Sequence, residues 1–198
     1  MPAPQKRLRS DQRKRQLVGI TLNLIATQGL QGTSMAKVAK AAGITEMALY
    51  RHFRSRKELI QAALDEMITI TSRFLESNEP DIKKRLRTIS SAIYDSMMSD
   101  RMEPRLLFEF LRAPAKEQLK DQMQAQFQAM LLTIEALLEE GIHNGQFRAD
   151  IDKTRIAWEI FAFGFTLNFV NVLGFENKFT KKRALTSLDE ILSKISLS

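Results

Sequence analysis

The chain has 198 residues, enough for one large domain or two small ones, and its 44% hydrophobic residues are sufficient for a buried core. It contains no cysteine, which excludes disulfides, thiolate metal sites and cysteine nucleophiles. The N-terminal stretch MPAPQKRLRSDQRKRQ is polar throughout and lacks the apolar run of a secretory signal, so we expect a cytoplasmic protein.

The positive charge is concentrated at the N-terminal end. Residues 1–58 contain 12 of the 30 Lys and Arg residues but only 3 of the 23 Asp and Glu residues, whereas the rest of the chain has a slight acidic excess. Basic side chains that contact phosphates supply most of the sequence-independent affinity for nucleic acid. The asymmetry favours a polyanion-binding N-terminal part, and the alternative is a basic end that only improves solubility.

A basic arm, residues 1–9, precedes the first predicted helix. The density of Lys and Arg from Lys6 to Arg15 is typical of arms that follow the DNA backbone or enter the minor groove, and equally of a solvated chain end. The helix begins near Ser10, which can cap it, and Gly29 can end it. Its apolar positions are Leu17, Ile20, Leu24 and Ile25.

Two short helices are predicted next. Thr33 or Ser34 can cap the first, and Gly43 supplies the left-handed residue that ends it. Thr45 then caps the second. Two short helices joined by a tight turn containing glycine are typical of a helix-turn-helix unit, in which the small side chain of Ala39 allows close packing.

The stretch GITEMALYRHF divides into an anchoring side and an outward side. Leu49 and Phe53 lie four residues apart and can face a small core, which directs the remaining side chains outward. A recognition helix needs this division, because its apolar side anchors it while its polar side reaches base edges. Each outward residue alone is more typical of an ordinary solvated helix, but the glycine turn, the spacing and the basic flanks together favour recognition. The outward residues are Glu46, Met47, Tyr50 and Arg51.

Residues 10–62, which include GLQGTSMAKVAKAAGITEMALYRHFRSRKELI, resemble the TetR-type transcriptional regulators. The resemblance implies a homodimer with an N-terminal DNA-binding head and a helical body that binds a small ligand. Two positions depart from the family pattern, since Arg56 stands where lysine is usual and Ala48 where many members have a hydroxyl residue. The resemblance implies phosphate contacts from Ser34, Tyr50, His52 and Arg56 and base contacts from Glu46, Met47 and Arg51, and we add the cap residue Thr45 to this DNA-binding set.

The body, residues 56–198, is predicted to consist of helices separated by proline breaks. Its methionine and aromatic clusters suit an apolar ligand cavity, because thioether side chains adapt to varied shapes, although the same residues can form a core without a pocket. A helix is predicted from Ser55 to about Glu76, breaks at Asn78 to Pro80, Pro104 and Pro114, and a long helix ending near Asn144. The pocket candidates are Tyr94, Met97, Met98, Phe108, Met123, Phe127, Met130, Phe161 and Phe165.

The C-terminal part is predicted to form the dimer interface. The stretch from Ile156 to Phe175 is apolar around most of its surface, yet it carries Glu159 and two asparagines, which favours a helix buried on two sides over a membrane span. A further helix capped by Thr180 has leucines at three-and-four spacing. With a second copy these helices would make a four-helix bundle. The interface candidates are Phe163, Leu167, Val170, Leu185, Leu188, Leu192 and Ile195.

These patterns together predict an all-α fold of about nine helices, with a helix-turn-helix domain over residues 10–55. No catalytic residue, metal or cofactor is expected, because His52 and His143 lie in different segments and Asp150 and Asp152 are typical of a turn and a cap. The predicted function is a homodimeric repressor that a small, apolar or amphipathic ligand releases from a near-palindromic operator on double-stranded DNA. The alternative is an architectural or partner-recruiting DNA-binding protein on the same fold without an inducer.

Overall fold

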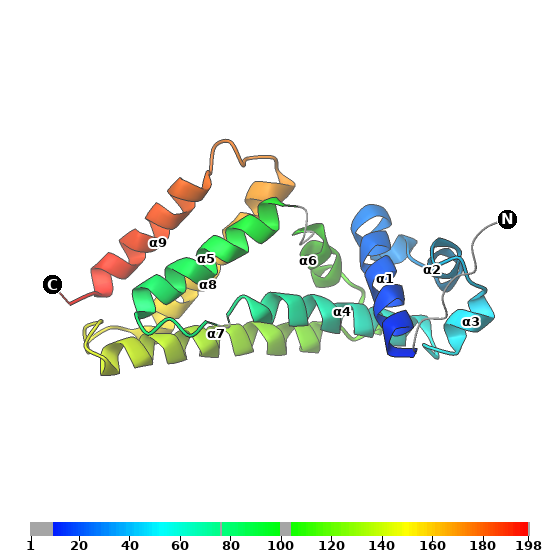
Figure 1. Ribbon diagram of the computed structural model, residues 1–198, viewed down its shortest axis with the longest axis horizontal. Coiled ribbons are helices and arrows are strands. Elements are labelled where there is room, and N and C mark those ends of the chain that lie inside the picture. The colour runs from blue at the N-terminus through cyan, green and yellow to red at the C-terminus, as the bar shows by residue number, and fades with distance from the viewer. Residues whose placement is uncertain (1–9, 76, 100–103, 198) are drawn as a thin grey trace. The chain divides into compact units, whose positions relative to one another are not determined.

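The computed structural model describes residues 10–75, 77–99 and 104–197. Within these residues the chain forms nine α-helices and one short 3-10 helix (Figure 1), which confirms the predicted all-α fold. None of the helices in the described part is both long and apolar enough to cross a membrane. The helices are α1 (Ser10–Gly32), α2 (Met35–Ala41), α3 (Glu46–Tyr50), α4 (Arg56–Arg73), α5 (Ile82–Met98), α6 (Pro104–Leu111), η1 (Ala115–Glu117), α7 (Lys120–His143), α8 (Lys153–Val172) and α9 (Lys181–Ile195).

The helices belong to two compact units. Unit 1 consists of the described residues up to 69 together with residues 108–119, and unit 2 consists of residues 70–107 and 120–197 where these are described. Unit 1 therefore contains α1 to α3, most of α4, the end of α6, and η1. It is built from two segments that are separated in the sequence.

The helix α1 bends at Gly29, the residue predicted to end it. Gly29 has φ 76°, in the left-handed region that glycine adopts without strain, and the last turn of α1 follows it. The amide of Leu30 donates a hydrogen bond of 2.7 Å to Oε2 of Glu109, and the hydroxyl of Thr33 donates one of 3.0 Å to the Gly29 carbonyl. The bend is therefore held in part by a side chain from the second segment of unit 1.

The helix-turn-helix unit has the predicted caps. Ser34 Oγ accepts a hydrogen bond from the Lys37 amide, and Thr45 Oγ1 accepts one from the Ala48 amide. Gly43, with φ 65°, forms the turn between α2 and α3. The buried Ala39 lets the two helices approach each other. These features confirm the predicted placement of α2, the turn and α3.

The helix α4 begins as predicted but ends earlier. Ser55 Oγ accepts from the Glu58 amide at 3.1 Å, and the Glu58 carboxylate accepts from the Arg54 amide at 2.7 Å, close to the reciprocal arrangement of a capping box. The regular helix stops at Arg73, whereas the sequence predicted an end near residue 76, which lies outside the described residues. Tighter turns at Phe74 and Leu75 end the helix instead.

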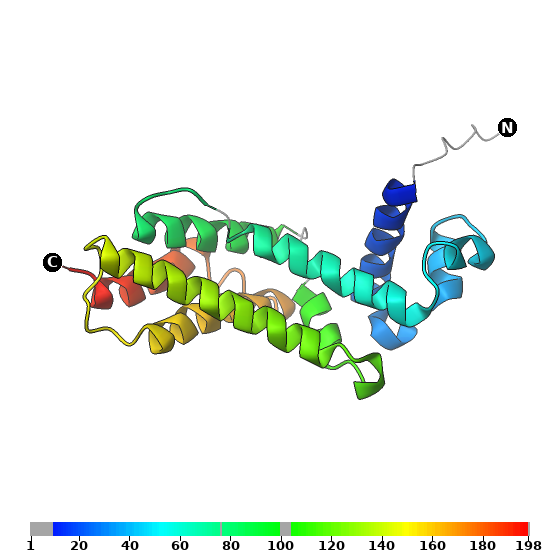
Figure 2. The same cartoon turned by 90° about the horizontal axis from the view of Figure 1, so that it is seen from below.

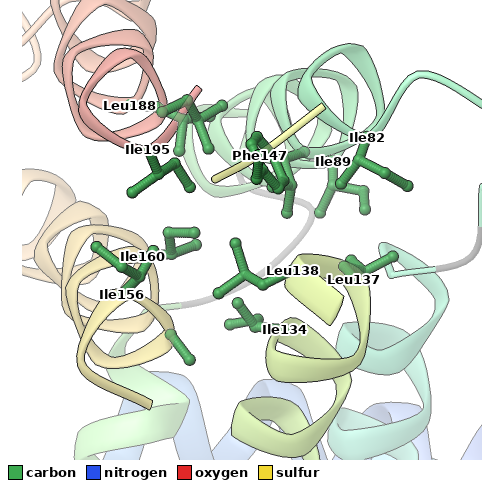
Figure 3. Packing of buried hydrophobic residues seen from close by; sticks show 13 residues of the cluster. Ile82, Ile89, Ile134, Leu137, Leu138, Phe147, Ile156, Ile160, Leu188 and Ile195 are labelled. Atoms are coloured by element: carbon green, nitrogen blue, oxygen red, sulfur yellow. The ribbon is translucent and has the colours of Figure 1, made fainter. Parts of the chain in front are cut away.

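Unit 2 is built around four helices, α5, α7, α8 and α9. The helix α7 packs against α8, and α5 contacts the other three helices (Figures 1 and 2). In Figure 3 the isoleucines and leucines of the four helices meet around Phe147, which follows α7. The side chains at the centre of this core are Ile82, Ile89, Ile134, Leu137, Leu138, Phe147, Ile156, Ile160, Leu188 and Ile195.

The end of α7 packs closely against Phe147. A Cβ atom placed on Gly141 would overlap the Phe147 ring, so only glycine fits at this position. After the turn at Gly145, the backbone of residues 146–148 pairs with residues 195–197, and the Arg148 amide donates to the Ile195 carbonyl at 2.9 Å. These contacts fix the chain between α7 and α8. The side chain of Asp152 caps α8 and that of Thr180 caps α9, which confirms the two predicted caps.

Candidate nucleic-acid interface

The short helix α3 presents one apolar and one polar side. Leu49 is fully buried, and Phe53 follows the helix in the interior of unit 1, as the sequence predicted. Met47 is 78% exposed and Tyr50 is 47% exposed. Glu46 and Arg51 are also exposed, so the four outward residues form one surface anchored from behind. An aromatic ring, an acid, an arginine and a flexible apolar side chain on such a surface can bond to base edges and contact a thymine methyl.

The N-terminal ends of α2 and α3 add hydrogen-bond donors to this surface. Ser34 and Thr45 are exposed, and each uses its side-chain oxygen as a helix cap, which leaves the hydroxyl hydrogen free to turn toward an acceptor. The partial positive charge at a helix N-terminus favours phosphate. Both residues are therefore suited to contact the DNA backbone.

His52 lies just beyond α3 in a positive environment. Burial lowers the pKa of its imidazole below the ordinary value of 6.5, and the nearby charges of Lys14, Arg13 and Arg51 lower the pKa further. The Nζ of Lys14 lies 6.0 Å from the centre of the Phe53 ring. The first turns of α1 therefore add their charge beside the end of α3. No local sequence pattern indicates that the start of α1 lies beside the end of α3. The sequence predicted a basic arm in this region but not the segment that it contacts. The other basic residues of that arm, Lys6, Arg7 and Arg9, lie outside the described residues.

Arg56 has protein partners for its whole guanidinium group. Its Nε donates to the Thr33 carbonyl at 2.8 Å, one Nη donates to the Leu30 carbonyl at 2.6 Å, and the other lies 2.6 Å from the Glu117 carboxylate. Glu117 is only 5% exposed. The arginine thus joins the end of α1 and the entry to α2 to the 108–119 segment. Sequence reasoning missed Glu117 because it lies 61 residues away.

The predicted pocket residues fall into separate groups. Tyr94 and Met97 are buried in a cluster with Leu167 and Ala184, and Met98 packs against it. Met123 is buried and Met130 is half-buried, both on α7. Phe108 belongs to unit 1, whereas the other candidates belong to unit 2.

Three of the pocket candidates form one aromatic group in unit 2. The ring of Phe127 on α7 lies 5.6 Å from that of Phe161 and 6.3 Å from that of Phe165, both edge to face. The row continues along α8 to Trp158 and Phe169. Among the described residues, no group of three or more His, Asp or Glu side chains could hold a metal ion.

Five of the seven interface candidates lie inside a single protomer and therefore cannot form a contact surface for a partner. Phe163 and Leu185 are only half-buried. The leucine stripe of α9 is used in the core of unit 2, because α9 packs on α5 and α8 of its own chain. The five buried candidates are Leu167, Val170, Leu188, Leu192 and Ile195.

The opposite side of α8 is the exposed apolar surface of this helix. Trp158 is 53% exposed, and Phe169, Val172 and Leu173 are exposed on the same side. The periodicity of α8 does not distinguish its two sides, because the helix is apolar all round, and two of the predicted interface residues, Leu167 and Val170, lie on the side that the protomer itself buries.

Comparison with known proteins identifies relatives of this chain. Residues 20–63 match the family model described as bacterial regulatory proteins, tetR family. The HTH-type transcriptional activator FasR of Mycolicibacterium smegmatis is 31% identical over 107 residues, which cover 52% of this chain and 48% of FasR. The HTH-type transcriptional repressor KstR2 of Rhodococcus jostii is 25% identical over 147 residues, covering 71% of this chain and 70% of KstR2.

Two further likenesses extend over most of the chain. The nucleoid occlusion factor SlmA of Klebsiella pneumoniae is 27% identical over 169 residues, which cover 81% of this chain and 83% of SlmA. The solved SmeT–triclosan complex superposes with a TM-score of 0.77 at 19% identity, covering 93% of this chain and 92% of SmeT. The latter likeness shows a common fold.

Proposed function

Because the chain belongs to the TetR family of transcriptional regulators, we propose that it is a homodimeric repressor released from a near-palindromic operator by a small-molecule ligand. Regulators of this family are DNA-binding proteins and not enzymes. They bind small-molecule effectors and are typically dimers. The observation that carries the proposal is the exposed surface of α3, held in place by the buried Leu49 and Phe53.

The proposed DNA contacts divide into two classes. Glu46 and Met47 on α3, and Arg51 directly after it, read base edges in the major groove. Tyr50 and His52 at the end of the helix, together with the exposed caps of α2 and α3, contact phosphates. Arg56 is the exception among the family positions. Since its guanidinium is already bonded to two carbonyls and a carboxylate, we assign it a positioning role behind the interface. The two caps are Ser34 and Thr45.

The proposed dimer forms through the exposed side of α8. A second copy would cover Trp158, Phe169 and Leu173, which otherwise remain in water. A two-fold axis presents two copies of α3 to successive major grooves, and this geometry requires a near-palindromic operator. Repression by KstR2 and the likeness to the SmeT–triclosan complex support a repressor that responds to a small molecule.

The proposal is tested by fluorescence anisotropy with duplexes from the region upstream of the gene and with a scrambled duplex, each over a salt series. Arg51→Ala is expected to weaken specific binding by about 1–3 kcal/mol and to narrow the gap between the two duplexes. Ser34→Ala is expected to weaken binding to both duplexes alike. The matched control is Lys182→Ala, which removes an exposed basic residue on α9. It should change neither the affinity for the upstream duplexes nor that for the scrambled duplex. Equal losses for Arg51→Ala and the control would contradict the assignment of α3 as the reading helix.

A second candidate function is supported by the likeness to SlmA, a nucleoid occlusion factor that matches over most of its length. The corresponding function for this chain is that of an architectural or partner-recruiting DNA-binding protein without an inducer. The two candidates differ in one measurable property, because only the repressor loses DNA affinity when a ligand occupies its body.

A further inference from the structure

Unit 1 contains an open groove between the first turns of α1 and one side of α4. Its volume is about 620 Å³, which is in the range of sites that hold a ligand or part of a chain. The deepest lining residues are apolar, because Val18 and Phe53 are buried and Ala62 is half-buried. The groove therefore has an apolar floor between two helices whose exposed residues are mostly charged.

The cations of the groove adjoin the proposed DNA interface. The Nζ of Lys14 lies 6.0 Å from the centre of the Phe53 ring, just before α4 begins. Lys57, in the first turn of α4, donates from its Nζ to Oε1 of Gln118. Arg15 is the third cation that lines the groove. Two of the three positive charges thus lie near the start of α4.

The acids of the groove extend further along α4. Asp65 is exposed and Glu66 is half-buried, and both line the groove about 12 Å along the helix from Lys57. The remaining acid, Glu58, is held at the start of the helix, where its carboxylate accepts from the Arg54 amide. Charges beside an apolar floor are screened less than charges in open water. This end of the groove therefore suits a basic segment.

The basic arm, residues 1–9, precedes the helix that forms one wall of the groove. These residues lie outside the described part of the chain, and α1 begins at Ser10. Arg15 lines the groove about 8 Å along α1 from Ser10, whereas the stretch from Gln5 to Ser10 can span about 16 Å. The arm is therefore long enough to turn back into the groove. It contains three cations and no acid, and the cations are Lys6, Arg7 and Arg9.

We propose that the basic arm occupies the groove between α1 and α4 when no DNA is bound, with its cations paired to Asp65 and Glu66, and that DNA phosphates displace it. Exposed ion pairs are weak, but the covalent link at Ser10 raises the effective concentration of the arm at the groove. The same cations cannot pair with carboxylates and phosphates at once, so the groove reduces the contribution of the arm to DNA affinity. The docking is independent of the proposed function, whereas the exchange with DNA rests on it.

Docking is tested in the full-length protein by disulfide formation, because the chain has no cysteine of its own. Gln5→Cys with Ala62→Cys places one thiol in the arm and one in the groove. The control pair is Gln5→Cys with Gln16→Cys, since Gln16 is exposed, lies about 9 Å along α1 from Ser10 and does not line the groove. At low salt the Ala62 pair is expected to close at least about five-fold faster than the control pair, and salt of about 1 M should remove this advantage. Equal rates at low salt would overturn the docking.

The role of the two acids is tested by adding Asp65→Asn and Glu66→Gln to the Ala62 pair. Disulfide formation is expected to slow to the rate of the control pair, because the arm loses its ionic partners. The matched control adds Asp150→Asn and Glu190→Gln, which remove two exposed carboxylates from unit 2 and should leave the rate unchanged. If the variant without Asp65 and Glu66 charges still closes as fast as the original pair, other groups hold the arm and the assignment is wrong.

The exchange with DNA is measured by comparing the closed Ala62 pair with the same protein after reduction. Anisotropy with the scrambled duplex over a salt series gives the sequence-independent affinity of each form. The reduced form is expected to bind more tightly at low salt, with a slope of log affinity against log salt that is steeper by about 2–3, because three further cations reach phosphates. Equal affinities and equal slopes would overturn the exchange. If neither form binds any duplex while the Ala62 pair still closes faster than its control, the docking is supported and the proposed function is contradicted.

Discussion

Two arginines five positions apart, Arg51 and Arg56, have different surroundings and therefore different expected roles. Arg51 is exposed on the surface formed by α3, so its guanidinium is available to a base or a phosphate. Arg56 is engaged by Glu117 and by two carbonyls of unit 1. The sequence motif around α3 predicts both as DNA-binding residues, because a motif reports position in the chain and not the partner that another segment supplies.

The pair of Arg56 and Glu117 yields a prediction about unit 1. Glu117→Gln is expected to lower the free energy of unfolding by about 1–3 kcal/mol, because it removes the charge from a buried hydrogen-bonded pair. Arg56→Met should cost more, since it leaves the Glu117 carboxylate buried and unpaired. Urea unfolding followed by circular dichroism measures both.

The double variant Arg56→Met with Glu117→Met distinguishes pairing from simple packing. It is expected to be less destabilised than the sum of the two single changes to methionine, because no unpaired charge remains. Additive losses would show that the two side chains act independently and would contradict the positioning role of Arg56.

Because of His52, the stability of the protein and its affinity for DNA are expected to change in opposite directions as pH falls. Its pKa in the free protein lies below 6.5, so the unfolded chain binds a proton more readily and the protein loses stability as pH falls below 6.5. A phosphate beside the imidazole raises the pKa again, so DNA binding takes up a proton and its affinity rises as pH falls from 7.5 to 5.5. Anisotropy titrations at the two pH values measure this effect.

His52→Gln supplies the control for the pH dependence. The glutamine does not titrate, so DNA affinity of the variant should change much less between the two pH values. A variant that retains the full pH dependence of the wild type would place the titrating group elsewhere on the complex.

At the scale of the helix, the sequence predicts the caps and turns at helix ends better than the side that each helix buries. Gly43 and Thr45 act through neighbouring backbone atoms, so their effect is visible in a short window of sequence, and the structure confirms it. Gly29 takes the expected positive φ, but α1 bends there and ends at Gly32. The face that α9 buries depends on distant segments. A leucine stripe is equally suited to a partner and to the core of its own chain, and here it packs against α5 and α8.

Two glycines within helices are expected to respond oppositely to alanine. Gly141→Ala should destabilise the protein by about 1–3 kcal/mol, because the added methyl overlaps the Phe147 ring in a packed core. Gly19→Ala should stabilise it by about 0.4–1 kcal/mol, since its Cβ meets no atom and alanine restricts the unfolded chain. Thermal melts of the two variants measure the difference, and a stabilised Gly141→Ala would contradict the described packing of Phe147.

At the scale of the whole molecule, the exposed side of α8 is the feature that the proposed dimer would cover. Phe169→Arg is expected to produce monomers at micromolar concentration, because the partner's apolar surface cannot compensate a buried guanidinium. Light scattering after size-exclusion chromatography measures the mass. Gln128→Arg on α7 is the control and should leave the mass unchanged. A dimeric Phe169→Arg would exclude this side of α8 as the interface.

The features of the candidate sites are also predictable from the sequence where local residues determine them, and not where distant segments do. The outward residues of α3 follow from one contiguous motif, and the structure exposes those that the sequence directed outward. The side of α8 that stays exposed has no comparable signal, because it depends on which side of the helix the neighbouring α5, α7 and α9 cover.

The discontinuous composition of unit 1 has a consequence for the order of events during synthesis. Leu30 and Arg56 take their partners from residues 109 and 117, so the N-terminal segment cannot complete its contacts when residue 69 leaves the ribosome. At about 5–20 residues per second, the remaining segment up to residue 119 arrives several seconds later. Throughout this interval the helix-turn-helix lacks its second segment. Nascent chains of this protein are therefore expected to acquire full DNA-binding competence only after more than half of the polypeptide has been made.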